Sequence, residues 1–136
     1  MSLIEDPITE LPNFLAEGDA RPPMRLLSCI IRPEKLEAVT EVLNSLELIG
    51  GMTVTDVRGC GRQKGYVELH RGGELPIRLL PKLRLDLVVS EEDVEAVFRA
   101  IERSAKTGQV GDGKIFVADV LNAVRIRTGE QGIGVL

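Results

Sequence analysis

Aromatic residues are scarce in this chain. It has three Phe, one Tyr and no Trp, so aromatic residues make up 3% of its 136 positions. Proteins that bind single-stranded nucleic acids use aromatic side chains as stacking platforms, and RNA-recognition sheets carry paired aromatics. The formal net charge of -4 also provides no overall positive field that would attract nucleic acid. We therefore expect no nucleic-acid partner.

Residues suited to redox, metal or covalent chemistry are equally few. Cys29 and Cys60 are the only cysteines, and His70 is the only histidine. The cysteines lack the spacing of a redox or zinc motif, and His70 has no second histidine beside it. Glu91 and Glu92 fall in the first turn of a predicted helix, where carboxylates offset the helix dipole. No pairing of nucleophile and base is visible, so we do not expect an enzyme.

Long apolar runs are absent as well. No run approaches the roughly 18 residues that span a bilayer, and the acidic N-terminus has none of the features of a signal peptide. These absences predict a cytoplasmic protein without membrane insertion. Residues 1–23 contain prolines and acidic residues with no sustained period, so we expect a flexible N-terminal extension followed by one domain over residues 24–136.

The patterning that is present alternates between strands and helices. The apolar run over 24–32 predicts a buried strand that stops at Pro33, and apolar spacings of three and four from Glu34 predict a helix that ends at Gly50 and Gly51. The same criteria predict strands over 52–58, 82–89, 115–120 and 124–127, and a helix that starts after Ser90. This β-α-β-β-α-β order predicts an α+β, ferredoxin-like double βαβ fold.

Residues 59–80 interrupt these patterns with five glycines, Pro76 and many charges. Loops longer than about 12 to 15 residues are uncommon in compact domains and tend to be functional. We therefore interpret this segment, between the second and third strands, as a candidate binding loop.

Three clusters have residues suited to binding an anion. Residues 108–114 read GQVGDGK, which matches the G-x-x-x-x-G-K part of a phosphate-binding loop. Ile115 follows where Ser or Thr would ligate magnesium, and the next predicted element is a strand, so an ordinary P-loop ATPase is not indicated. By itself, such a turn is also compatible with a plain connection.

The other two clusters lie elsewhere along the chain. Arg125 and Arg127 are two apart in a predicted strand, so their guanidinium groups would share one face and suit phosphate oxygens, although an exposed edge strand is the alternative. Residues 59–65, GCGRQKG, combine flexible glycines with two cations, and a basic turn is the alternative there. Together the three clusters favour a polyphosphate ligand.

These clusters, in this order, resemble the PII nitrogen-signalling family. The resemblance covers residues 24–130 and rests on six segments: RP at 32–33, GMTVT at 51–55, GCGRQKG at 59–65, LPK at 80–82, TGQVGDGKIFV at 107–117 and RIRTGE at 125–130. It implies a homotrimer whose three inter-subunit clefts each bind ATP or ADP, with the long loop (the T-loop) carrying the signal to partner proteins.

The resemblance also assigns roles to individual residues. Those implied to bind the nucleotide are Thr53, Gly59, Gly61, Arg62, Gln63, Asp86, Val88, Val110, Gly111, Asp112, Gly113, Lys114, Arg125 and Arg127. Asp86 and Val88 would act across the subunit boundary, although the family more often has Glu at the first of these positions. The residues implied to bind 2-oxoglutarate together with Mg²⁺ are Gln63, Lys64, Gly65 and Lys82, with Gln63 as the metal ligand.

The T-loop differs from the family pattern. Where many bacterial members have a tyrosine that is uridylylated this chain has Leu75, and Gly73 replaces the serine phosphorylated in some cyanobacterial members. Neither modification is therefore expected. The residues predicted to contact a partner, an ammonium transporter or a metabolic enzyme, are Glu68, His70, Arg71, Glu74 and Leu75, of which Glu68, Arg71 and Glu74 are retained from the family pattern. The alternatives are a PII-like sensor of another small anion such as bicarbonate, in a different pathway, and slow ATP hydrolysis at the glycine turn.

Overall fold

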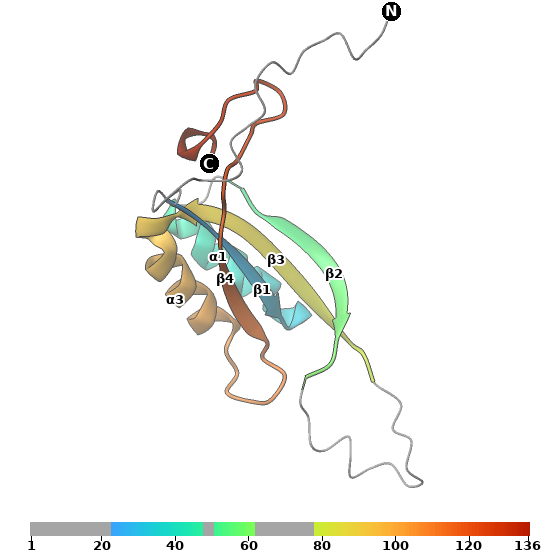
Figure 1. The fold of residues 1–136 in the computed structure, drawn as a ribbon. Helices are drawn as coiled ribbons and strands as arrows, with labels where there is room; N and C mark the ends of the chain where they lie inside the picture. Colours follow the sequence, from blue (N-terminus) through green and yellow to red (C-terminus); the bar gives the residue numbers. More distant parts are fainter. Residues whose placement is uncertain (1–22, 48–50, 62–77) are drawn as a thin grey trace, which may run out of the picture.

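A computed structural model describes residues 23–47, 51–61 and 78–136 (Figure 1). The described residues form one sheet, two α-helices and a C-terminal segment. None of the helices in these ranges is both long and apolar enough to cross a membrane.

The four strands form one antiparallel sheet in the order β2-β3-β1-β4 (Figure 1). Their bounds are Met24–Ile31 for β1, Thr53–Gly59 for β2, Leu80–Ser90 for β3 and Lys114–Asp119 for β4. β1 is central because it pairs with both β3 and β4, although these strands are distant from it in sequence. This strand order, with one helix after β1 and one after β3, confirms the α+β ferredoxin-like arrangement.

Both helices begin with a short 3-10 turn. The turn Pro33–Lys35 precedes α1, Leu36–Leu46, and the turn Glu91–Asp93 precedes α3, Val94–Ala105. α1 ends earlier than the glycine pair that was expected to stop it, because Glu47 adopts a left-handed conformation with φ 54° and its N–H bonds to the carbonyl of Asn44. A left-handed residue directly after the last turn is a common helix end, and here it is not a glycine.

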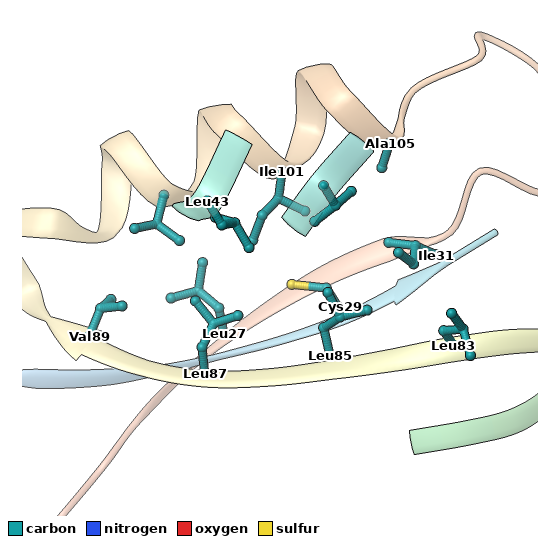
Figure 2. Close-up of a cluster of buried hydrophobic side chains, with 12 residues drawn as sticks. Leu27, Cys29, Ile31, Leu43, Leu83, Leu85, Leu87, Val89, Ile101 and Ala105 are labelled. Carbon is teal, nitrogen blue, oxygen red and sulfur yellow. The ribbon is translucent and has the colours of Figure 1, made fainter. Parts of the chain in front are cut away.

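The helices cover one face of the sheet, and the core lies between this face and the helices (Figures 1 and 2). Alternate residues of β1 and β3 point into it, including Leu27, Cys29, Leu85 and Leu87. They pack against helix residues such as Ile101 (Figure 2). Burying each such side chain contributes about 1.5 to 3 kcal/mol, so the alternation seen in the sequence is what anchors the sheet to its helices.

The predicted fifth strand over residues 124–127 is wrong. Val124 makes only an isolated bridge to Gln131, and residues 126–128 form a turn. The backbone N–H of Arg125 donates to the carbonyl of Glu130 at 2.8 Å, so the segment folds back on itself. A short turn of 3-10 helix, Ile133–Val135, ends the chain. Alternation over four residues was too short a signal to distinguish a strand from a turn.

Candidate functional site

The glycine-rich loop over residues 107–113 connects α3 to β4. Gly108, Gly111 and Gly113 have φ values of 87°, 104° and 101°, which side-chain-bearing residues rarely adopt. At Gly113 a Cβ atom would also lie 1.7 Å from the backbone oxygen of Ile30. The sequence therefore needs glycine there so that the loop can approach β1 closely.

The carboxylate of Asp112 organises this loop. It accepts hydrogen bonds from the backbone N–H groups of Thr107 and Gly108 at 2.9 and 2.8 Å, and from the Thr107 hydroxyl. The Nε of Arg32 donates to the same carboxylate at 3.0 Å. These bonds, with that of the Thr107 hydroxyl foremost and that of Arg32 next, hold the pKa of Asp112 well below its usual range.

Two cations bind carbonyl oxygens of the loop. Nη2 of Arg32 donates to the carbonyl of Val110 at 2.9 Å, and Nζ of Lys82 donates to that of Gly111. In contrast, the backbone N–H groups of Val110 and Gly111 have no hydrogen-bond acceptor among the described residues. Consecutive N–H donors whose carbonyls are held by cations are suited to bind an anion such as a phosphate group.

Four predicted residues outside the loop's turn lie near this end of the sheet. Gly59, at the end of β2, pairs with Leu80, and Gly61 follows at the base of the long loop. Lys82 faces Val57 two residues along the same pair of strands, and Lys114 opens β4 opposite Ile30. The structure therefore groups Gly59, Gly61, Lys82, Val110, Gly111, Asp112, Gly113 and Lys114 toward one end, which we call the loop half-site.

The other predicted residues that the structure describes are Thr53, Asp86 and Val88 on β2 and β3, and Arg125 and Arg127 in the C-terminal segment; we call these five the strand half-site. Thr53 pairs with Asp86 across β2 and β3. The Asp86 carboxylate accepts a hydrogen bond from the Ser28 hydroxyl at 2.7 Å and forms an ion pair with Arg84 at 3.0 Å. The C-terminal segment that carries both arginines leaves β4 at the end opposite the 107–113 loop (Figure 1). Nη1 of Arg125 pairs with Glu130 at 3.1 Å.

The 107–113 loop and the segment that carries the two arginines therefore lie at opposite ends of β4 within one chain. β4 separates the loop from the C-terminal segment, and its six residues from Lys114 to Asp119 span about 17 Å at about 3.3 Å per residue. Arg125 and Arg127 were predicted to share one face of a strand. That reason is wrong, because the backbone turns after Arg125 and is not a strand.

A cavity of about 230 Å³ lies beside the loop half-site. α3 contributes Phe98, Ile101 and Ala105, and Gly113 and Lys114 form its border with the loop. Its lining is largely apolar. Elsewhere too, residues 23–47, 51–61 and 78–136 contain no group of three or more His, Cys, Asp or Glu that could hold a metal. The polar donors of the loop, more than this cavity, define the candidate site.

Several predicted residues lie outside the described part of the chain: Arg62, Gln63, Lys64, Gly65, Glu68, His70, Arg71, Glu74 and Leu75. The structure adds two residues that had no predicted role, Arg32 and Thr107. Both lie in segments that carry the family resemblance, but their partner Asp112 is 80 residues from Arg32, and only the fold shows that they meet.

Comparison with known proteins identifies the family. Residues 24–130 match the family described as "Nitrogen regulatory protein P-II". The chain belongs to this family. It is 55% identical over 111 residues to nitrogen regulatory protein P-II 2 of Methanothermobacter thermautotrophicus, a match that covers 80% of this chain and 94% of the relative. Nitrogen regulatory protein GlnK of Escherichia coli K12 is 48% identical over 107 residues, covering 79% of this chain and 95% of GlnK.

The fold is shared with a solved P-II structure. The crystal structure of Arabidopsis thaliana PII bound to citrate aligns with a TM-score of 0.67 and 33% sequence identity. The alignment covers 85% of this chain and 94% of that protein. P-II family proteins are regulatory signal transducers, and a signalling role in nitrogen regulation is thus established at the level of the family.

Proposed function

We propose that this P-II protein is a trimeric sensor that binds ATP or ADP at clefts between subunits and regulates partner proteins of nitrogen and carbon metabolism. The observation that carries this proposal is the separation of the two half-sites. The loop half-site offers backbone N–H donors and Lys114 to phosphate groups, and the strand half-site offers Arg125 and Arg127. Since β4 holds the loop donors and the two arginines apart within one chain, a complete site would take them from two copies.

Each half-site would do a different task. Lys114 and the N–H groups of Val110 to Gly113 would bind phosphates, with Gly59, Gly61, Arg62 and Gln63 at the base of the T-loop beside them. From the adjacent copy, Arg125 and Arg127 would neutralise the phosphate charge while Thr53, Asp86 and Val88 contact the base region. We assign no catalytic residue, because binding alone accounts for the chemistry of these groups.

The second effector would be a dicarboxylate. Lys82, with Lys64 and Gly65, would bind 2-oxoglutarate, and Gln63 would ligate Mg²⁺ together with oxygens of the nucleotide and keto acid. The citrate in the Arabidopsis relative shows that a P-II protein accepts a small polycarboxylate. Nζ of Lys82 donates to the carbonyl of Gly111 here, so this bond would have to be exchanged for the bond to the effector.

The signal would leave the domain, residues 24–136, through the T-loop at residues 59–80. The protein would be cytoplasmic, and residues 1–23 would form an extension before the domain. Glu68, His70, Arg71 and Glu74 are the proposed partner contacts, for an ammonium transporter or a metabolic enzyme. Leu75 has no hydroxyl, so control by uridylylation of that residue is excluded chemically. A ligand that favours one T-loop conformation would change what a partner binds.

Calorimetric titration of the purified protein with ATP and Mg²⁺, with and without saturating 2-oxoglutarate, tests this function. We expect ATP to bind, and to bind more tightly with the keto acid. Binding that 2-oxoglutarate leaves unchanged would favour the alternative, a sensor of another anion such as bicarbonate. Unchanged ATP affinity in the double variant Arg125→Glu/Arg127→Glu would contradict the proposed cleft.

A further inference from the structure

Asp112 contacts its own chain in a way that leaves little for a ligand. Its two carboxylate oxygens accept four hydrogen bonds, from two backbone N–H groups, the Thr107 hydroxyl and Arg32. A carboxylate would also repel a phosphate group rather than bind it. Asp112 therefore shapes the loop, and what holds Asp112 decides the geometry of the loop donors.

We propose that Arg32 and Thr107 are positioning residues for nucleotide binding, which hold Asp112 so that the N–H groups of Val110 and Gly111 are arranged for phosphate before the nucleotide arrives. This inference rests on the proposed function. It assigns a role to two residues that do not themselves need to touch the nucleotide.

Arg32 is suited to this role by its place and its shape. It directly follows Ile31, which is 1% exposed in the core, so its backbone is anchored to β1, one of the two inner strands. Its guanidinium spans the loop, with Nε on the carboxylate of Asp112 and Nη2 on the carbonyl of Val110. Lysine has a single ammonium group and cannot reproduce this fork.

Thr107 holds the opposite side of the same carboxylate. It lies just after α3 and donates to Asp112 through both its N–H and its hydroxyl, and the hydroxyl oxygen accepts from the N–H of Gln109 at 3.2 Å. Valine has nearly the same shape and keeps the backbone N–H, so Thr107→Val removes only the hydroxyl bonds.

Without these bonds, a loop with three positive-φ glycines has more conformations available to it. The apparent dissociation constant rises by the inverse of the fraction of loops that are competent to bind. A loop that is competent about 10% of the time binds about tenfold more weakly. Losing these bonds would lower the affinity for the nucleotide and leave the fold intact, because Arg32 and Asp112 are both partly exposed and lie outside the core.

The test compares Arg32→Lys and Thr107→Val with matched substitutions on the helices, Arg99→Lys and Thr40→Val. Calorimetry without any keto acid measures ATP affinity, and hydrogen exchange measures the amides of residues 107–113 with and without saturating ATP. We expect about tenfold weaker binding and faster loop exchange in the free state for the first pair. Saturating ATP should restore slow exchange, and the control pair should match the unmodified protein.

Asp112→Asn separates positioning from simple electrostatics. It removes a negative charge near the phosphates, so electrostatics alone predicts tighter ATP binding, whereas a positioning role predicts weaker binding. Adding Thr107→Val to Asp112→Asn should cause little further loss, because both act through one carboxylate.

The outcomes distinguish this inference from the function on which it rests. Failure of the unmodified protein to bind either ATP or ADP overturns both. Normal binding by the unmodified protein with unchanged affinity in Arg32→Lys and Thr107→Val overturns only the positioning role. Tighter binding by Asp112→Asn does the same.

Discussion

At the scale of single residues, Gly113 has the least room for a side chain among the described glycines. Its φ of 101° and the Ile30 carbonyl at 1.7 Å from a hypothetical Cβ both exclude a side chain. We expect Gly113→Ala to cost at least about 2 kcal/mol of unfolding free energy through strain and displacement of β1 or the loop. Urea unfolding measures this cost.

Gly134→Ala is the matched control, because nothing lies within 4 Å of a Cβ there and its φ is not positive. It should change the unfolding free energy by less than about 0.5 kcal/mol. Equal effects of the two substitutions would show that the close approach of Gly113 to β1 is not what makes glycine necessary.

Cys29 predicts a pH dependence in the alkaline range. Burial, and secondarily the negative charge of Asp86, raises the pKa of its thiol from 9.0 to about 11. The folded state therefore holds this proton more tightly than the unfolded state does. The resulting stability is fully present below about pH 9 and is lost as the pH rises through about 11.

Urea unfolding of the protein and of Cys29→Ala at a series of pH values from about 8 to 11 tests this titration. We expect the unfolding free energy of the unmodified protein to fall more steeply with pH than that of Cys29→Ala. Parallel curves would show that this thiol does not contribute. The exposed thiol of Cys60 remains in both proteins, so it cancels in the comparison.

At the scale of elements, stability comes from the contact of α1 and α3 with one face of the sheet. Leu85 in β3 and Val97 in α3 are both fully buried in this contact. Replacing Leu85 by Ala should cost about 2 to 5 kcal/mol, because the lost burial is accompanied by a cavity. Chemical denaturation measures it.

Val54→Ala in β2 is the comparison at this scale. Val54 is 41% exposed, so its truncation removes much less buried surface than that of Leu85. We expect a loss below about 1 kcal/mol. A loss equal to that of Leu85→Ala would mean that β2 packs on something that the single chain does not contain.

At the scale of the whole molecule, the two half-sites predict that binding can be restored by mixing subunits. Lys114→Glu damages only the loop half-site, and Arg125→Glu/Arg127→Glu damages only the strand half-site. Neither variant alone should bind ATP. When the two are unfolded and refolded together, about a quarter of the clefts should combine two intact halves, because contacts around a cyclic trimer run head to tail.

Calorimetric stoichiometry of the mixture, with light scattering to measure its mass, reads out this restoration. Mixing the two variants without unfolding is the control, since subunits then have no opportunity to exchange. If refolded mixtures bind no ATP while remaining trimeric, the nucleotide site lies within one chain and the division into half-sites is not functional.

The amino-acid sequence by itself determined most of the fold. The apolar run of β1, the alternation in β3 and the three-and-four spacing in the helices are local patterns, and each predicted an element that the structure contains. The glycines at 108, 111 and 113 also predicted the turn between α3 and β4, because positive φ is a local requirement.

Only the tertiary structure decided how the site is organised. The contacts of Arg32 and Lys82 with the 107–113 loop join residues that are 80 and 29 positions apart. The placement of Arg125 at the far end of β4 depends on a turn stabilised by hydrogen bonds to Glu130 and Gly129. Local periodicity contains no information on such long-range or turn-specific bonds, since they arise only after β1, β3 and β4 have paired.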